Sequence, residues 1–252
     1  MTTNILAIGA HPDDETLMAG GTLAMLAHSG ARLHIVSATR GEGGDMGESP
    51  ICTREELGAV RSAELRCAAE ALGAVGLEFL GYVDPVCMVD GEVFAFEADF
   101  DVLVQQIREL IRRRQADVVI SHGTDGEYGH PAHKLLNRAV SEAVSRMRDP
   151  PCFYTWAART PDVEDRTQNE SDPAHFVLDV SRWLDRKAAA LDCHKTQHFL
   201  FLRRRENVTR MIDVARKREA FRRQISMAAG APHDAFAALL RAAGAWTPTW
   251  TR

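Results

Sequence analysis

The 252-residue sequence predicts an α/β fold, with a mainly parallel sheet and helices on both of its faces. Short runs of apolar residues, typical of strands buried on both sides, alternate with longer segments of helical periodicity. We find no internal repeat and no low-complexity linker that would divide the chain. A hydrophobic content of 45% is enough for a full-sized core. These observations favour a Rossmann-like domain.

The first part of the chain provides most of the predicted sheet. Apolar runs bounded by polar residues predict strands, and apolar residues three and four apart predict helices. A glycine at position 73 is a typical helix end, and a proline at position 131 is typical of a helix start. We predict strands at Asn4–Gly9, Ala31–Ala38, Leu77–Leu80 and Ala116–Ser121, and helices at Glu15–Ser29, Arg54–Leu72, Phe100–Arg114 and Pro131–Met147.

The remaining part is predicted to complete the sheet and then become helical. Strands are expected at Phe153–Trp156 and Phe176–Val180, followed by a helix at Arg182–His194. The arginine-rich segment Arg203–Met227 is expected to be a long charged helix, and Pro232–Ala243 a shorter one. We therefore divide the chain into a core, residues 1–202, and a C-terminal helical extension, residues 203–252, packed on the same domain.

Composition excludes several classes of partner. A net charge of −5 and a pI near 6.1 provide no broad basic surface for nucleic acid. No window approaches the roughly 18 uninterrupted apolar residues of a membrane span. The five cysteines are scattered without a Cys-x-x-Cys pair, which argues against a disulfide framework and against a thiolate zinc site. Since the N-terminus also lacks the pattern of a signal peptide, we expect a cytoplasmic protein.

Two polar clusters follow predicted strands. The first, residues 11–15, reads His-Pro-Asp-Asp-Glu and follows the first strand, and the second, residues 125–133, contains His130 and His133. Ligands in such sheets bind beyond the carboxyl ends of the strands. If the strand order begins 3-2-1-4, the two clusters face each other. Two imidazoles and one carboxylate are a common catalytic zinc set that leaves a position for water.

Simpler interpretations exist for each cluster on its own. Asp13 or Asp14 could instead cap the following helix. Asp125 and Gly126 could form only a turn. A single histidine such as His130 is more often structural than a ligand. The metal-site interpretation gains weight because both clusters follow strands that the topology can bring together.

Several stretches of the chain resemble one known family. The segment Ala10–Glu15 with Gly20-Gly21 is similar to the signature of the LmbE/PIG-L family of zinc-dependent N-acetylglucosaminyl deacetylases. The resemblance runs in order from about residue 4 to residue 198. It includes the segments Thr39–Gly44, Leu57–Glu64, Phe79–Asp84, Gly129–His133 and Lys187–Gln197.

The resemblance implies a role for each matching residue. The metal ligands would be His11, Asp14 and His133, holding zinc, although iron(II) can occupy the same ligands. Asp13 would be the general base that takes a proton from water, and His130 would stabilise developing charge and protonate the leaving amine. The other implied roles concern an oxyanion-facing Tyr128, a sugar-binding Arg61 and a substrate-facing Asp84. Many members carry an acid where this chain has Ala132, and that difference bears on the protonation of His130.

The expected activity is removal of the N-acetyl group from an N-acetylglucosamine-type sugar or sugar conjugate. One alternative is an amidase of the same fold that acts on a bulkier N-acyl or thiol-conjugate substrate. A second is a non-catalytic metal- or sugar-binding protein, against which the extra acid Asp13 argues. The partner would be a small N-acetylated sugar conjugate, and the chain can form a homo-oligomer.

Overall fold

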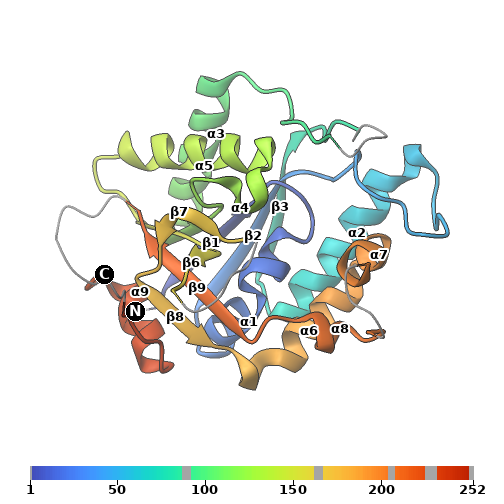
Figure 1. Cartoon of the computed structure of the whole chain (residues 1–252). Coiled ribbons are helices and arrows are strands. Elements are labelled where there is room, and N and C mark those ends of the chain that lie inside the picture. The colour runs from blue at the N-terminus through green and yellow to red at the C-terminus, as the bar shows by residue number, and fades with distance from the viewer. Residues whose placement is uncertain (1, 87–91, 162–166, 204–207, 225–231, 250–252) are drawn as a thin grey trace.

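The structure, a computed structural model, describes residues 2–86, 92–161, 167–203, 208–224 and 232–249. Its centre is a seven-stranded sheet in the order β3-β2-β1-β4-β5-β9-β8 (Figure 1). Neighbours from β3 to β5 are parallel, whereas β9 runs antiparallel to both β5 and β8. The strands are β1 Asn4–Gly9, β2 Arg32–Thr39, β3 Gly76–Tyr82, β4 Val118–Ser121, β5 Cys152–Thr155, β8 Phe176–Asp179 and β9 Arg218–Arg223.

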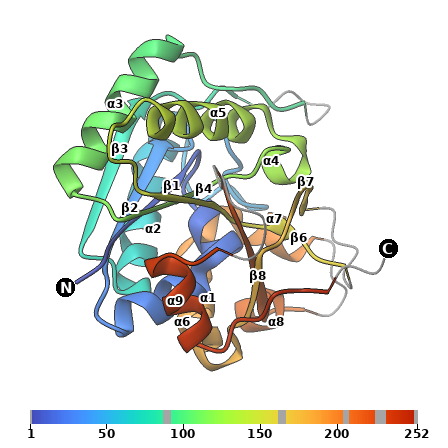
Figure 2. The same ribbon diagram turned by 90° about the vertical axis from the view of Figure 1, so that its left-hand side faces the viewer.

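Helices cover both faces of this sheet. In Figures 1 and 2, α3 and α5 lie on one face, and α1, α2 and α6 lie on the other. The side chains of β1 alternate between the two faces, so both faces are apolar and need a cover. Ile5 and Ala7 pack into the apolar cluster under α1 and α2, while Leu6 and Ile8 pack into the cluster under α3 and α5. The main helices are α1 Asp14–His28, α2 Arg54–Leu72, α3 Phe100–Arg114, α5 Pro131–Ser145, α6 Leu184–Cys193 and α9 Ala235–Ala242.

Several short elements complete the described part of the chain, and apart from η1 and α8, which overlap predicted helices, they were not predicted. Strands β6 and β7 form a separate parallel pair, and the short helices lie in the connections. These elements are β6 Ala158–Arg159, β7 Asn169–Pro173, α4 Gly126–Gly129, η1 Ser181–Trp183, η2 Lys195–Gln197, α7 His198–Leu202 and α8 Met211–Val214. The predicted mainly parallel α/β class and the strand order 3-2-1-4 are confirmed.

The predicted long helix over residues 203–227 is wrong in the described part of that segment. Arg218–Arg223 forms strand β9, in which Glu219 and Phe221 are buried and Arg218 is exposed. Arginine favours helices, but pairing with β5 and β8 overrides that propensity here. The segment after residue 202 is therefore not purely helical, because it contributes a strand to the main sheet. The division of the chain at residue 202 stays a prediction.

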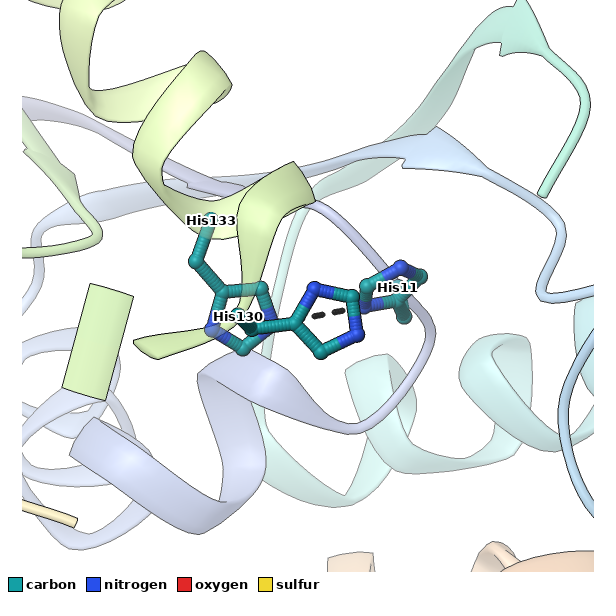
Figure 3. A group of neighbouring side chains, drawn as sticks. All are labelled: His11, His130 and His133. Carbon is teal, nitrogen blue, oxygen red and sulfur yellow. Dashed lines mark hydrogen bonds between the residues drawn. The ribbon is translucent and has the colours of Figure 1, made fainter. Parts of the chain in front are cut away.

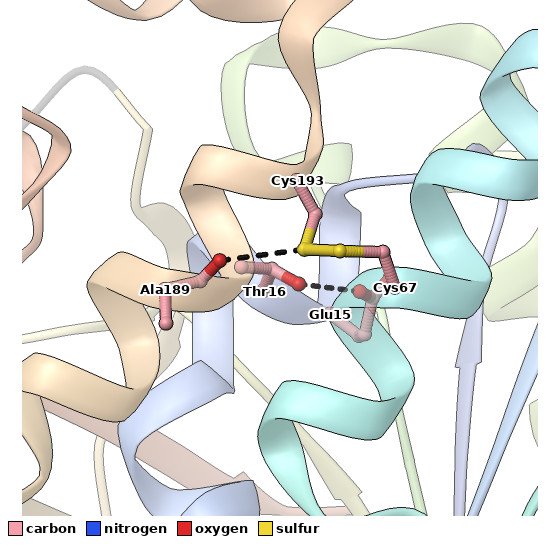
Figure 4. The surroundings of a disulfide bond; sticks show 5 residues. All are labelled: Glu15, Thr16, Cys67, Ala189 and Cys193. Atoms are coloured by element: carbon pink, nitrogen blue, oxygen red, sulfur yellow. Dashed lines mark hydrogen bonds between the residues drawn. A yellow bond between two sulfur atoms is a disulfide. The ribbon is translucent and has the colours of Figure 1, made fainter.

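One disulfide corrects the expectation drawn from the cysteines. Cys67 of α2 and Cys193 at the end of α6 are joined, with Cα atoms 5.7 Å apart, and Figure 4 shows Glu15 and Thr16 of α1 in their surroundings. A sequence separation of 126 residues hid the pairing, since the helices meet only in the folded chain. The cytoplasmic location therefore loses the support of unpaired cysteines and stays a prediction. Among the described helices, none is both long and apolar enough to cross a membrane.

The topology brings the two polar clusters together. Strands β1 and β4 are parallel neighbours, and Ile8 of β1 pairs with Ser121 of β4. Their carboxyl ends therefore lie at the same edge of the sheet. The chain continues from β1 into the loop before α1, and from β4 into α4 and α5.

Candidate metal centre

The turn between β1 and α1 directs two adjacent acids to different partners. Asp13 has a φ of 120°, an uncommon backbone conformation for a residue other than glycine. Asp14 Oδ2 accepts hydrogen bonds from the backbone N–H of Ala10 and of His11, at 3.0 and 2.8 Å. Asp13 Oδ2 instead faces Arg61, at 3.3 Å from Nη2. The two carboxylates therefore diverge, so one can bind a cation while the other stays available.

The three predicted metal ligands lie together. His133 Nε2 is 3.3 Å from His11 Nδ1 and 3.3 Å from Asp14 Oδ1, and His11 Nδ1 is 3.6 Å from Asp14 Oδ2. Donor atoms in a tetrahedral zinc site, each about 2.0–2.1 Å from the ion, lie about 3.3 Å apart. The spacing of these side chains therefore fits a single small divalent cation.

A third imidazole lies beside the two predicted histidine ligands. Figure 3 shows His130 beside His11 and His133, with a dashed line between the rings of His11 and His133. A nitrogen of His130 lies within 4.8 Å of nitrogens from both. Its Nδ1 accepts a hydrogen bond from the backbone N–H of Ala132 at 3.2 Å, at the start of α5. The proton of the neutral ring is therefore on Nε2, which can act as a donor.

Carboxylates contact the outer ring nitrogens of both predicted histidine ligands. Glu127 Oε2 lies 2.7 Å from His133 Nδ1, and Asp84 Oδ1 lies 3.2 Å from His11 Nε2. A carboxylate behind a ligating histidine sets its tautomer and its orientation. Asp84, predicted to face substrate, is 7% exposed and contacts a predicted metal ligand. Its substrate-facing role stays a prediction beside this observed contact.

Burial and neighbouring charges shift the pKa values of the acid and imidazole groups. Burial raises the pKa of Asp13 to about 7. The positive charge of Arg61 opposes this shift, and the negative charge of Asp14 adds to it. Burial also lowers the pKa of His130 to about 2, with the charges of His133 and His11 adding to the effect. A carboxyl group with a pKa near neutrality suits a general base. The lowered pKa makes His130 neutral at physiological pH, and Ala132 is consistent with this state because it adds no negative charge that would favour the imidazolium.

Two further residues of the centre had no predicted role. His122, which directly follows β4, is fully buried and stacks on His133 with ring centroids 3.9 Å apart. Burial opposes its charged form, but Glu127 and Asp14 raise the pKa of His122 to about 9. Glu127 is also buried, and its charge interactions with His122 outweigh desolvation and hold its pKa well below the usual range. A polar residue directly after a buried strand was the available signal for His122.

Arg61 and Tyr128 occupy different depths of the site. Arg61 is 3% exposed, and its terminal nitrogens donate to the backbone oxygens of Gly41 and Pro12, at 3.1 and 2.6 Å, and to Asp13. Arg61 therefore holds Asp13, the predicted base, in place, and its own contact with sugar stays a prediction. Tyr128 is 54% exposed, and its ring centroid lies 5.7 Å from that of His130. It stands at the mouth of the centre, where it can meet a ligand.

The mainly parallel sheet identifies an α/β protein. The buried histidine–aspartate cluster at the carboxyl edge of this sheet identifies a candidate metal centre. The chain belongs to the PIG-L family, whose model, described as GlcNAc-PI de-N-acetylase, matches residues 6–144. The matched region contains the three predicted ligands and the two acids behind them.

Curated relatives cover most of the chain. A 1D-myo-inositol 2-acetamido-2-deoxy-alpha-D-glucopyranoside deacetylase of Acidothermus cellulolyticus is 32% identical, over 78% of this chain and 80% of the relative. A probable N-acetyl-alpha-D-glucosaminyl L-malate deacetylase 2 of Bacillus cereus is 31% identical, over 78% of this chain and 84% of the relative. The names of both relatives describe deacetylases.

Solved structures share the fold. The N,N'-diacetylchitobiose deacetylase of Pyrococcus horikoshii matches with a TM-score of 0.62 and 19% identity, over 88% of this chain and 84% of that one. A 4-carboxy-2-hydroxymuconate hydratase from Pseudomonas putida matches with a TM-score of 0.62 and 23% identity, over 90% of this chain and 98% of that one. At these identities the likeness shows the fold alone.

Proposed function

We propose that the protein is a metal-dependent N-deacetylase that hydrolyses the acetamide of an N-acetylglucosamine conjugate, with zinc or iron(II) as the metal. The main supporting observation is that His133 Nε2 lies 3.3 Å from both His11 Nδ1 and Asp14 Oδ1, while the other oxygen of Asp14 is 3.6 Å from His11 Nδ1 and a second acid lies beside them. Curated relatives are named as deacetylases of N-acetylglucosamine joined to inositol or malate, which supports this substrate class.

Each side chain of the centre has a distinct task in this proposal. A zinc ion held by the three ligands would supply Lewis acidity, which polarises the amide carbonyl and acidifies water. Asp13, fixed by Arg61, accepts a proton from the attacking water. The proton then passes to the amide nitrogen as the C–N bond breaks, which leaves a free amine and acetate. His130, with its proton on Nε2, donates a hydrogen bond to the oxygen that gains charge. Tyr128 approaches the same oxygen from the mouth.

Two alternatives remain distinguishable by assay. An amidase of the same fold would release amine from bulky N-acyl or thiol-conjugate substrates but not from acetylated ones. A binding protein would hold metal or sugar without turnover. The pKa of Asp13 near neutrality favours a catalytic role, because a site that only binds metal needs no such base.

The test combines metal content with amine release. Protein purified without chelator is analysed for bound zinc and iron, and then assayed with N-acetylglucosaminyl-inositol and N-acetylglucosaminyl-malate. We expect near-stoichiometric metal and chelator-sensitive amine release. Asp13→Asn should keep the metal and lose at least about 100-fold in kcat, the usual share of a general base. Turnover of Asp13→Asn equal to that of wild type would refute the mechanism. Failure of wild type to bind metal would refute the proposed site.

A further inference from the structure

One carboxylate oxygen anchors two stacked imidazoles. Glu127 Oε2 lies 2.9 Å from Nδ1 of His122 and 2.7 Å from Nδ1 of His133, and the rings are inclined by only 22°. The other oxygen of Glu127, Oε1, accepts from the backbone N–H of Gly123 at 3.1 Å and from Asn169 Nδ2 at 3.2 Å. Four polar groups therefore contact this carboxylate and hold it in place.

The opposite edges of the two rings meet one acid. His133 Nε2 is 3.3 Å from Asp14 Oδ1, and His122 Nε2 is 3.2 Å from Asp14 Oδ2. Oδ2 also accepts from two backbone N–H groups, whereas Oδ1 faces His133. Each oxygen of Asp14 thus lies near one predicted histidine ligand, Oδ1 near His133 and Oδ2 near His11 at 3.6 Å, and Oδ2 is in addition held by the backbone.

The backbone of Glu127 shows that this arrangement is held against local preference. Its φ is +59°, in the left-handed region that residues other than glycine rarely adopt. Such a conformation persists only where the surrounding contacts determine it. The backbone N–H of Glu127 donates to Asn169 Oδ1 at 2.9 Å, so β7 supports the same turn.

We propose that His122 and Glu127 are positioning residues that set the metal affinity of the centre by fixing Asp14 and His133 as one unit. His122 is not a ligand in this proposal, because its Nε2 already contacts the backbone N–H of Ala10 at 3.0 Å and Asp14 Oδ2 at 3.2 Å. A ligand set of Asp14, His122 and His133 is the competing arrangement, since these three also offer atoms within 4.8 Å of one another. The inference rests on the proposed metal centre.

The test measures metal binding without turnover. Chelator-stripped wild type, Glu127→Gln and His122→Phe are titrated with Zn²⁺ against a chromophoric chelator, and the visible spectrum of the Co²⁺ form is recorded. Loss of a carboxylate behind a ligating histidine typically weakens metal affinity about 10–100-fold. We expect that loss in both variants, with one metal still bound and the intensity of the Co²⁺ bands retained.

Glu64→Gln is the matched control. Glu64 is another buried acid, and it accepts from the backbone N–H and the hydroxyl of Thr196, at 2.8 and 2.7 Å, without touching a predicted ligand. It should destabilise the fold and leave the Zn²⁺ affinity unchanged. Unchanged affinity in Glu127→Gln and His122→Phe would overturn the inference alone. A His122→Phe variant that binds no metal would assign His122 as a ligand and overturn it too. A wild type that binds no metal would overturn the proposed function as well.

Discussion

Breaking the Cys67–Cys193 disulfide should lower the free energy of unfolding by about 3–5 kcal/mol. The bond closes a loop with a sequence separation of 126 residues. Chain-entropy theory gives about 16.5 cal/mol/K for a loop of that length, or about 5 kcal/mol at 25 °C, and measured disulfides commonly deliver somewhat less. The hydrogen bonds between Glu64 and Thr196 still join the same regions after reduction. We therefore place the expected loss below the theoretical value.

The assay is urea unfolding of wild type and of a Cys67→Ser/Cys193→Ser variant. For a chain of this size, a loss of 3–5 kcal/mol lowers Tm by about 10 °C. Cys52→Ser is the control, because Cys52 is a free thiol, and it should unfold like wild type. Adding reductant should shift wild type and Cys52→Ser but not the double variant. Equal unfolding midpoints for wild type and the double variant in the absence of reductant would refute the reasoning.

Three further perturbations test the packing and charge of the fold. Glu219→Gln removes the buried partner of Lys187, whose Nζ lies 2.7 Å away, and should cost about 3–5 kcal/mol in urea unfolding; a loss below 1 kcal/mol would contradict it. Gly21→Ala would place a Cβ 2.5 Å from Cβ of Val180 and should lower stability by about 1–3 kcal/mol, so unchanged thermal unfolding would contradict that close approach. Burial opposes ionisation of Glu78, but two arginine hydrogen bonds lower its pKa. Its stabilising effect is therefore full above the unfolded pKa of about 4.3 and is lost as pH falls through the folded value. Glu78→Gln should accordingly lower stability by less than about 1 kcal/mol at pH 7 and not at pH 2.5, and a difference independent of pH would contradict the assignment.

Local patterns predicted the elements of the sheet core and the edge at which the centre lies. Strand β1 and the polar loop after it were both readable, because an apolar run and adjacent acids are local features. Strand β9 could not be predicted from its own sequence. Its pairing partners lie 39–69 residues upstream along the chain, and its arginines favour a helix. The error shows that tertiary pairing, which a single segment does not encode, decided that element.

The position of the candidate metal centre was predictable because two polar clusters follow neighbouring strands, whereas the residues that support it were not. The contacts of His122 and Glu127 are visible only in the folded chain, where α4 directs the Glu127 carboxylate toward the imidazoles of His122 and His133. The placement of Arg61 against Asp13 also depends on how α2 packs beside the first loop. The type of a residue thus indicates which reactions or ligands it can support, but its contacts in the folded chain determine which role it has.

Glu219 has a consequence for the order in which the chain can fold. Its carboxylate accepts the backbone N–H groups of Gly21 and Thr22 in the middle of α1, which are 198 and 197 residues away in sequence. The helix that begins with Asp14 therefore receives these contacts only after most of the chain has been synthesised. Contacts between such distant segments are slow to form, because a long loop must close first. During synthesis on the ribosome, α1 can complete its packing only after β9 has been synthesised and has joined the sheet.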